Sequence, residues 1–159
     1  MSTVGDKLVT FRLGDDYFAA DVHAVQRVLR YTVPTSVPDM PDYIEGVIDY
    51  SGKVVPIVNL RRRFELPSVA IDDETRTVVL SAGGEWVGVV VDAVTSVVPF
   101  VAGAISPPPK LFRGLAEPYL KGILRLGDRL VMFLDVEEIL STTDRIALQQ
   151  AGAEALANG

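Results

Sequence analysis

The sequence contains no cysteine and only one histidine, His23. Without cysteine there is no disulfide framework, no thiolate nucleophile and no cysteine-ligated zinc site, which suits a reducing compartment. The GxSxG, GxxxxGK and GxGxxG motifs are also absent, so neither a nucleophile elbow nor a common phosphate-binding loop is indicated. His23 lies beside Val22 and Val25, which favours a structural role over a catalytic one. We therefore predict that the protein is not an enzyme and has no catalytic residue, cofactor or metal site.

Positive charge is scarce, because 15 Lys and Arg face 21 Asp and Glu and the net charge is −6. Proteins that hold nucleic acid usually carry a basic stripe. The longest apolar run, residues 87–105, contains Asp92, Thr95 and Pro99, so two strands and a loop explain it better than a membrane span. The first residues lack the basic and apolar regions of a signal peptide. We predict a cytoplasmic protein with no nucleic-acid partner and no direct membrane insertion.

An internal repeat is the strongest signal in the chain. Residues 43–60 match residues 119–136 at a constant offset of 76, and residues 14–29 match residues 83–98 at an offset of 69. The aligned pairs include Tyr43 with Tyr119, Gly46 with Gly122, Lys53 with Arg129, Asn59 with Asp135, and Tyr17 with Trp86. Each half reads as two strands, a connection, two more strands and a short helical turn, with hairpin signals at Ser51-Gly52 and Gly127-Asp128.

The abundance of valine favours strands, so the repeat predicts two related small barrels, or half-barrels that share one core. We place the first barrel at residues 7–66, the second at 67–141, and a C-terminal helix with a loose tail at 142–159. The sequence leaves open whether the terminal strands exchange between barrels. At Gly46 and Gly122 we expect a close backbone approach or a bulge with positive φ.

The two helical turns differ in charge. The first turn begins at Asn59 and is expected to expose Arg61, Arg62 and Arg63, whereas its counterpart exposes Glu137 and Glu138. Both turns are explained simply as solvated faces, or as docking surfaces of opposite polarity, because complementary charge sets partner choice and encounter rate.

Two stretches carry a family resemblance: "YIEGVIDYSGKVVPIVNLRRRFELP", and "VGVVVDAVTSVV" followed by "YLKGILRLGDRLVMFLDVEEIL". Over residues 7–141 the sequence resembles the CheW-like family of chemotaxis coupling proteins. The resemblance implies an all-β fold of two tandem SH3-like five-stranded barrels packed on a shared apolar core. It also implies a non-enzymatic adaptor whose partners are the regulatory domain of a CheA-type histidine kinase and the cytoplasmic tips of methyl-accepting chemoreceptors. The adaptor is expected to be recruited to membrane-associated receptor arrays.

This sequence departs from the family at one pair of positions. The family often has Arg where this chain has Ser51, paired with Glu where this chain has Arg27, so the usual ion pair cannot form. We expect Arg27 to project toward solvent or to find a carboxylate elsewhere. The candidate partner-binding residues are Arg27, Ser51, Gly52, Arg61, Arg63, Glu137 and Glu138.

A second hypothesis is a small-molecule or peptide-binding barrel with an aromatic site. Its candidate residues are Tyr17, Tyr43, Trp86 and Tyr119. These residues occupy equivalent positions of the repeat, Tyr17 with Trp86 and Tyr43 with Tyr119. A common packing role in both halves explains this more simply than a ligand site does.

Overall fold

The computed structural model describes residues 6–82, 85–107 and 119–139. Within them the chain is mostly β, as predicted, with only short helical turns; the expected C-terminal helix at 142–159 lies outside the described residues. The strands are β1 (Lys7–Leu13), β2 (Asp16–Asp21), β3 (Val25–Arg30), β4 (Ile44–Tyr50), β5 (Lys53–Asn59), β6 (Arg76–Ala82), β7 (Glu85–Val91), β8 (Ala93–Pro99), β9 (Leu120–Leu126) and β10 (Arg129–Leu134). The helical turns are η1 (Val22–Ala24), α1 (Leu60–Arg63), η2 (Ala102–Ala104) and η5 (Val136–Ile139).

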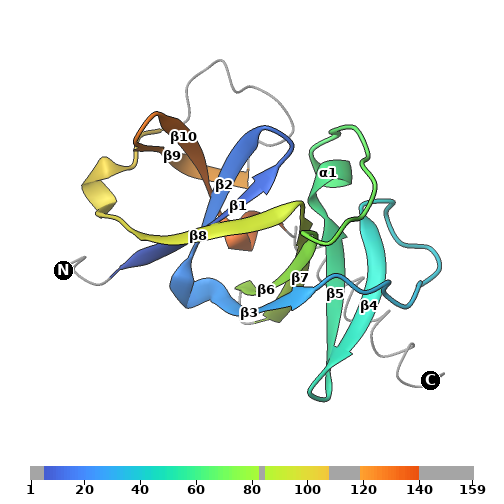
Figure 1. Cartoon of the computed structure of the whole chain (residues 1–159). Helices are drawn as coiled ribbons and strands as arrows, with labels where there is room; N and C mark the ends of the chain where they lie inside the picture. Colours follow the sequence, from blue (N-terminus) through green and yellow to red (C-terminus); the bar gives the residue numbers. More distant parts are fainter. Residues whose placement is uncertain (1–5, 83–84, 108–118, 140–159) are drawn as a thin grey trace.

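The strands form two five-stranded sheets that do not follow the order of the chain. Sheet A has the strand order β8-β1-β2-β10-β9, and sheet B has the order β3-β6-β7-β5-β4. The boundary expected between residues 66 and 67 therefore does not separate the sheets, because β1 and β2 lie in sheet A with β8 to β10. Figure 1 shows the blue strands β1 and β2 beside the late strands β8 and β10, with η1 leading from β2 into β3 of the other sheet.

The two sheets correspond to one another under the repeat. The first two strands of each repeat complete the sheet that is made by the last three strands of the other. In each sheet one junction is parallel, β2 with β10 and β7 with β5, and the other is antiparallel, β1 with β8 and β6 with β3. Equivalent loops also repeat: Asn59 N–H donates to the Tyr43 carbonyl at 2.7 Å, and Asp135 N–H donates to the Tyr119 carbonyl at 2.7 Å. The exchange is thus reciprocal.

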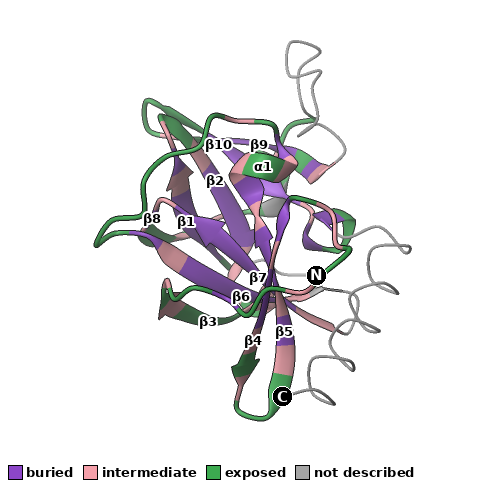
Figure 2. Cartoon of the chain, turned by 90° about the vertical axis from the view of Figure 1, so that its right-hand side faces the viewer, coloured by how far each residue is buried: buried purple, intermediate pink, exposed green. Residues whose placement is uncertain are grey.

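Side chains alternate between a shared core and a smaller core inside each sheet. On β2, Phe18 and Ala20 pack into the shared core while Ala19 joins the core of sheet A, as the period of two in a strand requires. On β7, Val89 packs into the shared core and Val90 into the core of sheet B. The shared core draws buried residues from both sheets (Figure 2), and each fully buried Leu or Phe stabilises the fold by roughly 1.5–3 kcal/mol.

Gly46 and Gly122 lie where another backbone segment approaches closely, as predicted. Thr35 and Val47 exchange two backbone hydrogen bonds, at 2.8 and 2.9 Å, and a Cβ on Gly46 would lie 2.1 Å from the Thr35 carbonyl oxygen. A Cβ on Gly122 would lie 2.4 Å from the Ser106 carbonyl oxygen. Of these two glycines, only Gly46 has a positive φ, of 148°, and it follows a register shift in the pairing of β4 with β5.

Candidate partner-binding surface

The basic turn α1 forms as the sequence predicts. Asn59 is its N-cap, and the Asn59 side chain accepts a hydrogen bond from the Arg62 N–H at 3.1 Å, which satisfies one of the free donors at a helix start. Leu60 and Phe64 are buried one turn apart. Consecutive side chains of a helix are rotated by about 100° from one another, so the three arginines of α1 point in different directions.

Arg61 is directed inward, so the expectation that it is exposed is wrong. Its side chain is 12% exposed and forms a bidentate ion pair with Asp92, with Nε at 3.0 Å from Oδ1 and Nη2 at 2.5 Å from Oδ2. The Asp92 Oδ2 also accepts the Gly14 N–H at 2.7 Å. Asp92 is the residue between β7 and β8, and Gly14 lies in the β1–β2 turn. Asp92 therefore connects α1, which comes directly after β5 of sheet B, to the β1–β2 turn of sheet A.

The environment of Asp92 stabilises its charged form. Burial alone would raise the pKa of Asp92, but hydrogen bonds from Arg61 and from the Gly14 N–H, with attraction to Arg61 and Arg12, outweigh burial and lower the pKa below its ordinary value. The same hydrogen bond to Asp92 raises the pKa of Arg61. Both groups are therefore charged at neutral pH.

We predict that Asp92→Asn destabilises the protein at neutral pH by about 2 kcal/mol, because it breaks a partly buried pair and leaves Arg61 uncompensated. A carboxyl group with a lowered folded-state pKa contributes stability above its unfolded pKa of about 3.9, and the contribution is lost as pH falls through the folded-state value. Urea unfolding at a series of pH values should show the two proteins converging in acid. Asp73→Asn, at an exposed position, is the matched control; equal loss in both variants at neutral pH would contradict the prediction.

Arg63 was also expected to be exposed but is half-buried, because the equivalent tyrosines of the two repeats hold it. Its guanidinium lies 4.2 Å from the centre of the Tyr43 ring and 4.8 Å from that of Tyr119, and such cation–π contacts strengthen when they are withdrawn from water. Arg62 is the exposed arginine of α1, and its Nη1 donates to the Asp42 carbonyl at 3.0 Å. The basic turn thus uses two of its three arginines in packing.

The acidic turn η5 behaves differently. Val136 and Ile139 are buried and anchor the turn, while Glu137 and Glu138 are exposed. Glu137 also lines a pocket of about 430 Å³ together with Asp21, His23, Lys121 and Asp135. The two turns have opposite charge in the sequence, but they expose different numbers of charged groups. The turn η5 exposes both of its carboxylates, whereas α1 exposes one guanidinium.

Ser51 and Gly52 form the tip of the β4–β5 hairpin, and Arg27 of β3 contacts the preceding residue, Tyr50. Ser51 and Gly52 have φ of 51° and 83°, the conformation of the predicted two-residue turn. Arg27 is exposed as expected, but its partner is a phenol and not a carboxylate: Nε donates to the Tyr50 hydroxyl at 2.5 Å, and the guanidinium lies 5.8 Å from the Tyr50 ring centre. Sequence reasoning missed Tyr50, which has no aromatic counterpart in the second repeat.

The aromatic residues of the second hypothesis already carry cations from this chain on their faces. Lys53 lies over Trp86 at 4.9 Å, and Arg129, the repeat equivalent of Lys53, lies over Tyr17 at 3.9 Å. Tyr43 and Tyr119 hold Arg63. These contacts support a common packing role for the aromatic residues in both halves and do not favour an aromatic ligand site.

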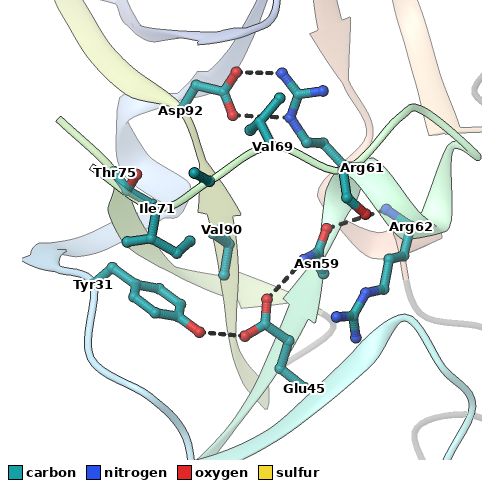
Figure 3. Close-up of a pocket in the computed structure, with 12 residues that line it drawn as sticks. Tyr31, Glu45, Asn59, Arg61, Arg62, Val69, Ile71, Thr75, Val90 and Asp92 are labelled. Atoms are coloured by element: carbon teal, nitrogen blue, oxygen red, sulfur yellow. Dashed lines mark hydrogen bonds and ion pairs between the residues drawn. The ribbon is translucent and has the colours of Figure 1, made fainter. Parts of the chain in front are cut away.

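A polar network that the sequence did not reveal lines a small pocket of about 180 Å³ beside the ion pair (Figure 3). The Tyr31 hydroxyl donates to Glu45 at 2.5 Å, and the Asn59 side chain donates to the other Glu45 oxygen at 2.8 Å. Burial, together with the hydrogen bond to Glu45, raises the pKa of Tyr31 to about 12. Val69 and Ile71 of the linker between β5 and β6 also line the pocket. The network links Tyr31, which follows β3, to Glu45 of β4, and both carboxylate oxygens of Glu45 accept a hydrogen bond within it.

Neither a metal-ligand cluster nor a membrane-spanning helix is found in the part of the chain that the structure describes. No group of three or more His, Asp or Glu side chains there is placed to hold a metal ion. In the same residues, no helix has the length and apolar character that crossing a membrane requires.

Two interlocked five-stranded sheets around a shared core, with charged turns at the surface, define a double SH3-like barrel domain. The chain matches the CheW-like domain over residues 7–144 and belongs to that family. It is 37% identical over 142 residues to the chemotaxis protein CheW of Klebsiella aerogenes, covering 89% of this chain and 86% of the relative. It is 29% identical over 140 residues to protein FrzA of Myxococcus xanthus, covering 87% of each.

A solved structure has the same fold. The scaffolding protein TtCheW from Thermoanaerobacter tengcongensis superposes with a TM-score of 0.79 at 26% identity, covering 87% of this chain and 90% of that one. The chain is therefore a scaffold protein of the chemotaxis type. The role of the seven candidate residues in binding partners stays a prediction.

Proposed function

We propose that this protein is a non-enzymatic adaptor that couples methyl-accepting chemoreceptors to the regulatory domain of a CheA-type histidine kinase, at membrane-associated receptor arrays in the cytoplasm. The observation that carries the proposal is the family match over residues 7–144, which spans the whole described fold. The relatives named as chemotaxis proteins and the solved scaffolding protein support it.

The surface of the molecule is consistent with binding other proteins. Glu137 and Glu138 are exposed on η5, and the apolar side chains of Val97 and Val101 are 55% and 56% exposed. Exposed apolar side chains and exposed charges are both common components of protein interfaces.

Two assays test the proposal with the receptor fragment and kinase encoded in the same genome. The protein should bind the kinase regulatory domain and the receptor cytoplasmic fragment in separate titrations. It should also be required for the receptor fragment to change the rate of kinase autophosphorylation. If the protein binds neither, and leaves the kinase rate unchanged in the presence of receptor, the proposed function is rejected.

We predict that Glu137→Lys/Glu138→Lys weakens binding to the kinase regulatory domain about fivefold at low salt, because exposed interfacial charges mainly set encounter rate and partner choice. The difference should shrink as salt rises, since exposed charges are screened beyond about 10 Å at 0.1 M. Asp15→Lys/Asp16→Lys is the matched control, because it makes the same charge change at an exposed turn of sheet A. Equal affinities of both variants across the salt series would place the kinase surface elsewhere.

A further inference from the structure

Four side chains from four strands of sheet B form one surface, which we call the cationic hairpin patch: Arg27 of β3, Tyr50 of β4, Lys53 of β5 and Trp86 of β7. The rings of Tyr50 and Trp86 lie 6.2 Å apart, with Arg27 over the first ring and Lys53 over the second. The patch lies at the end of sheet B where the β4–β5 hairpin extends beyond the rest of the sheet, and the tip of that hairpin is exposed (Figure 2).

The two cations of the patch have no carboxylate partner within the described residues. The salt bridges there join Arg12 to Glu74, His23 to Asp6 and Arg61 to Asp92. Arg27 uses one of its five N–H donors on Tyr50. Alternation along β4 and β7 puts the side chains of Asp49 and Glu85 on the other side of their strands from the patch. Two exposed cations thus stand together on a chain whose net charge is −6.

The second half of the molecule shows which part of this patch is packing. The equivalent of the Lys53–Trp86 contact is present there as Arg129 over Tyr17, at 3.9 Å. The equivalent of Arg27 is Ser96, whose hydroxyl is hydrogen-bonded to that of Thr10 at 2.7 Å. A cation over an aromatic ring therefore belongs to the repeated fold, whereas the second cation, Arg27, belongs to sheet B alone.

We propose that the cationic hairpin patch binds an acidic segment of a protein partner, with Asp or Glu carboxylates pairing with Arg27 and Lys53, which Tyr50 and Trp86 hold in place. The inference rests on the proposed function and adds a determinant of partner choice to it. A partner segment that carries bases is repelled by Arg27 and Lys53, and a segment that carries acids is selected.

Trp86 is the only tryptophan in the chain, so its fluorescence reports directly on the patch. The probe is a short blocked peptide that alternates Glu and Gly, with Gln–Gly and Lys–Gly peptides of equal length as controls. The Glu peptide should give a saturable change in Trp86 fluorescence that weakens with salt, and the other two peptides should not. No change with the Glu peptide up to about 1 mM, or the same curve with the Gln peptide, would overturn the inference.

The variants assign the binding to Arg27. Arg27→Glu leaves the Lys53–Trp86 contact in place and should weaken the Glu peptide about tenfold, which corresponds to about 1.4 kcal/mol. Arg129→Glu makes the same charge change at the equivalent hairpin of sheet A and should leave binding unchanged. A loss with Arg129→Glu as large as with Arg27→Glu would show general charge attraction and overturn the inference. The titration contains neither receptor nor kinase, so it can fail while the proposed function stands, or succeed while the proposed function fails.

Discussion

Gly46→Ala is expected to destabilise the protein by about 3 kcal/mol or more, near the upper end of single-substitution effects. The added Cβ would lie 2.1 Å from the carbonyl oxygen of Thr35, and the φ of 148° at this position is one that residues with a side chain rarely adopt. Thr35 cannot move away without breaking its two backbone hydrogen bonds to Val47. Urea unfolding at neutral pH, or loss of soluble expression, measures the effect.

Substitutions at two further glycines distinguish the cost of the steric clash from the cost of the positive φ. Gly122→Ala meets the Ser106 carbonyl oxygen at 2.4 Å without a positive φ, and Gly127→Ala has a φ of 61° with nothing within 4 Å. We expect Gly122→Ala to be severe, and Gly127→Ala to cost about 1 kcal/mol, the ordinary cost of a left-handed residue. If Gly46→Ala were no worse than Gly127→Ala, the close approach of Thr35 would not be a constraint on the fold.

The second large effect is expected on cutting the chain between residues 66 and 67. Each piece lacks strands from the middle of a sheet: without β6 and β7, β3 cannot reach β5, and without β1 and β2, β8 cannot reach β10. Isolated hairpins are marginally stable in water. Neither fragment alone should show a cooperative thermal or urea transition.

Mixing the two fragments supplies the control. Equimolar fragments should recover the circular dichroism of strands and a single cooperative transition whose midpoint rises with concentration, because the folded state is now a complex. A fragment that unfolds cooperatively by itself would contradict the reciprocal exchange of strands.

The repeat made most of the architecture predictable, but not the pairing of its strands. The β1–β2 hairpin and its equivalent β6–β7 are both largely apolar, so no local pattern tells whether each lies beside strands of its own repeat or of the other. Hairpins such as β4–β5 were predictable because their turn chemistry is local, with Ser51 and Gly52 at the tip. The exchange depends on the length and path of the connections, and no local pattern encodes it.

The candidate site shows the same limit. The Asn59 cap and the buried pair of Leu60 and Phe64 follow from spacing along the chain. The fate of the arginines depends on residues far away, Asp92 for Arg61 and Tyr119 for Arg63. A charged residue between strands, as Asp92 is, was the available signal for a buried partner, but it does not identify which cation it meets.

The passage from β7 to β8 goes through the single residue Asp92, and Asp92 is held by Arg61 and by the Gly14 N–H. The corresponding passage from β2 to β3 is the short turn η1. With two such brief crossings and one shared core, the two barrels pack as one body over the described residues. Proteins bound to different faces of such a body would be held in a fixed mutual orientation.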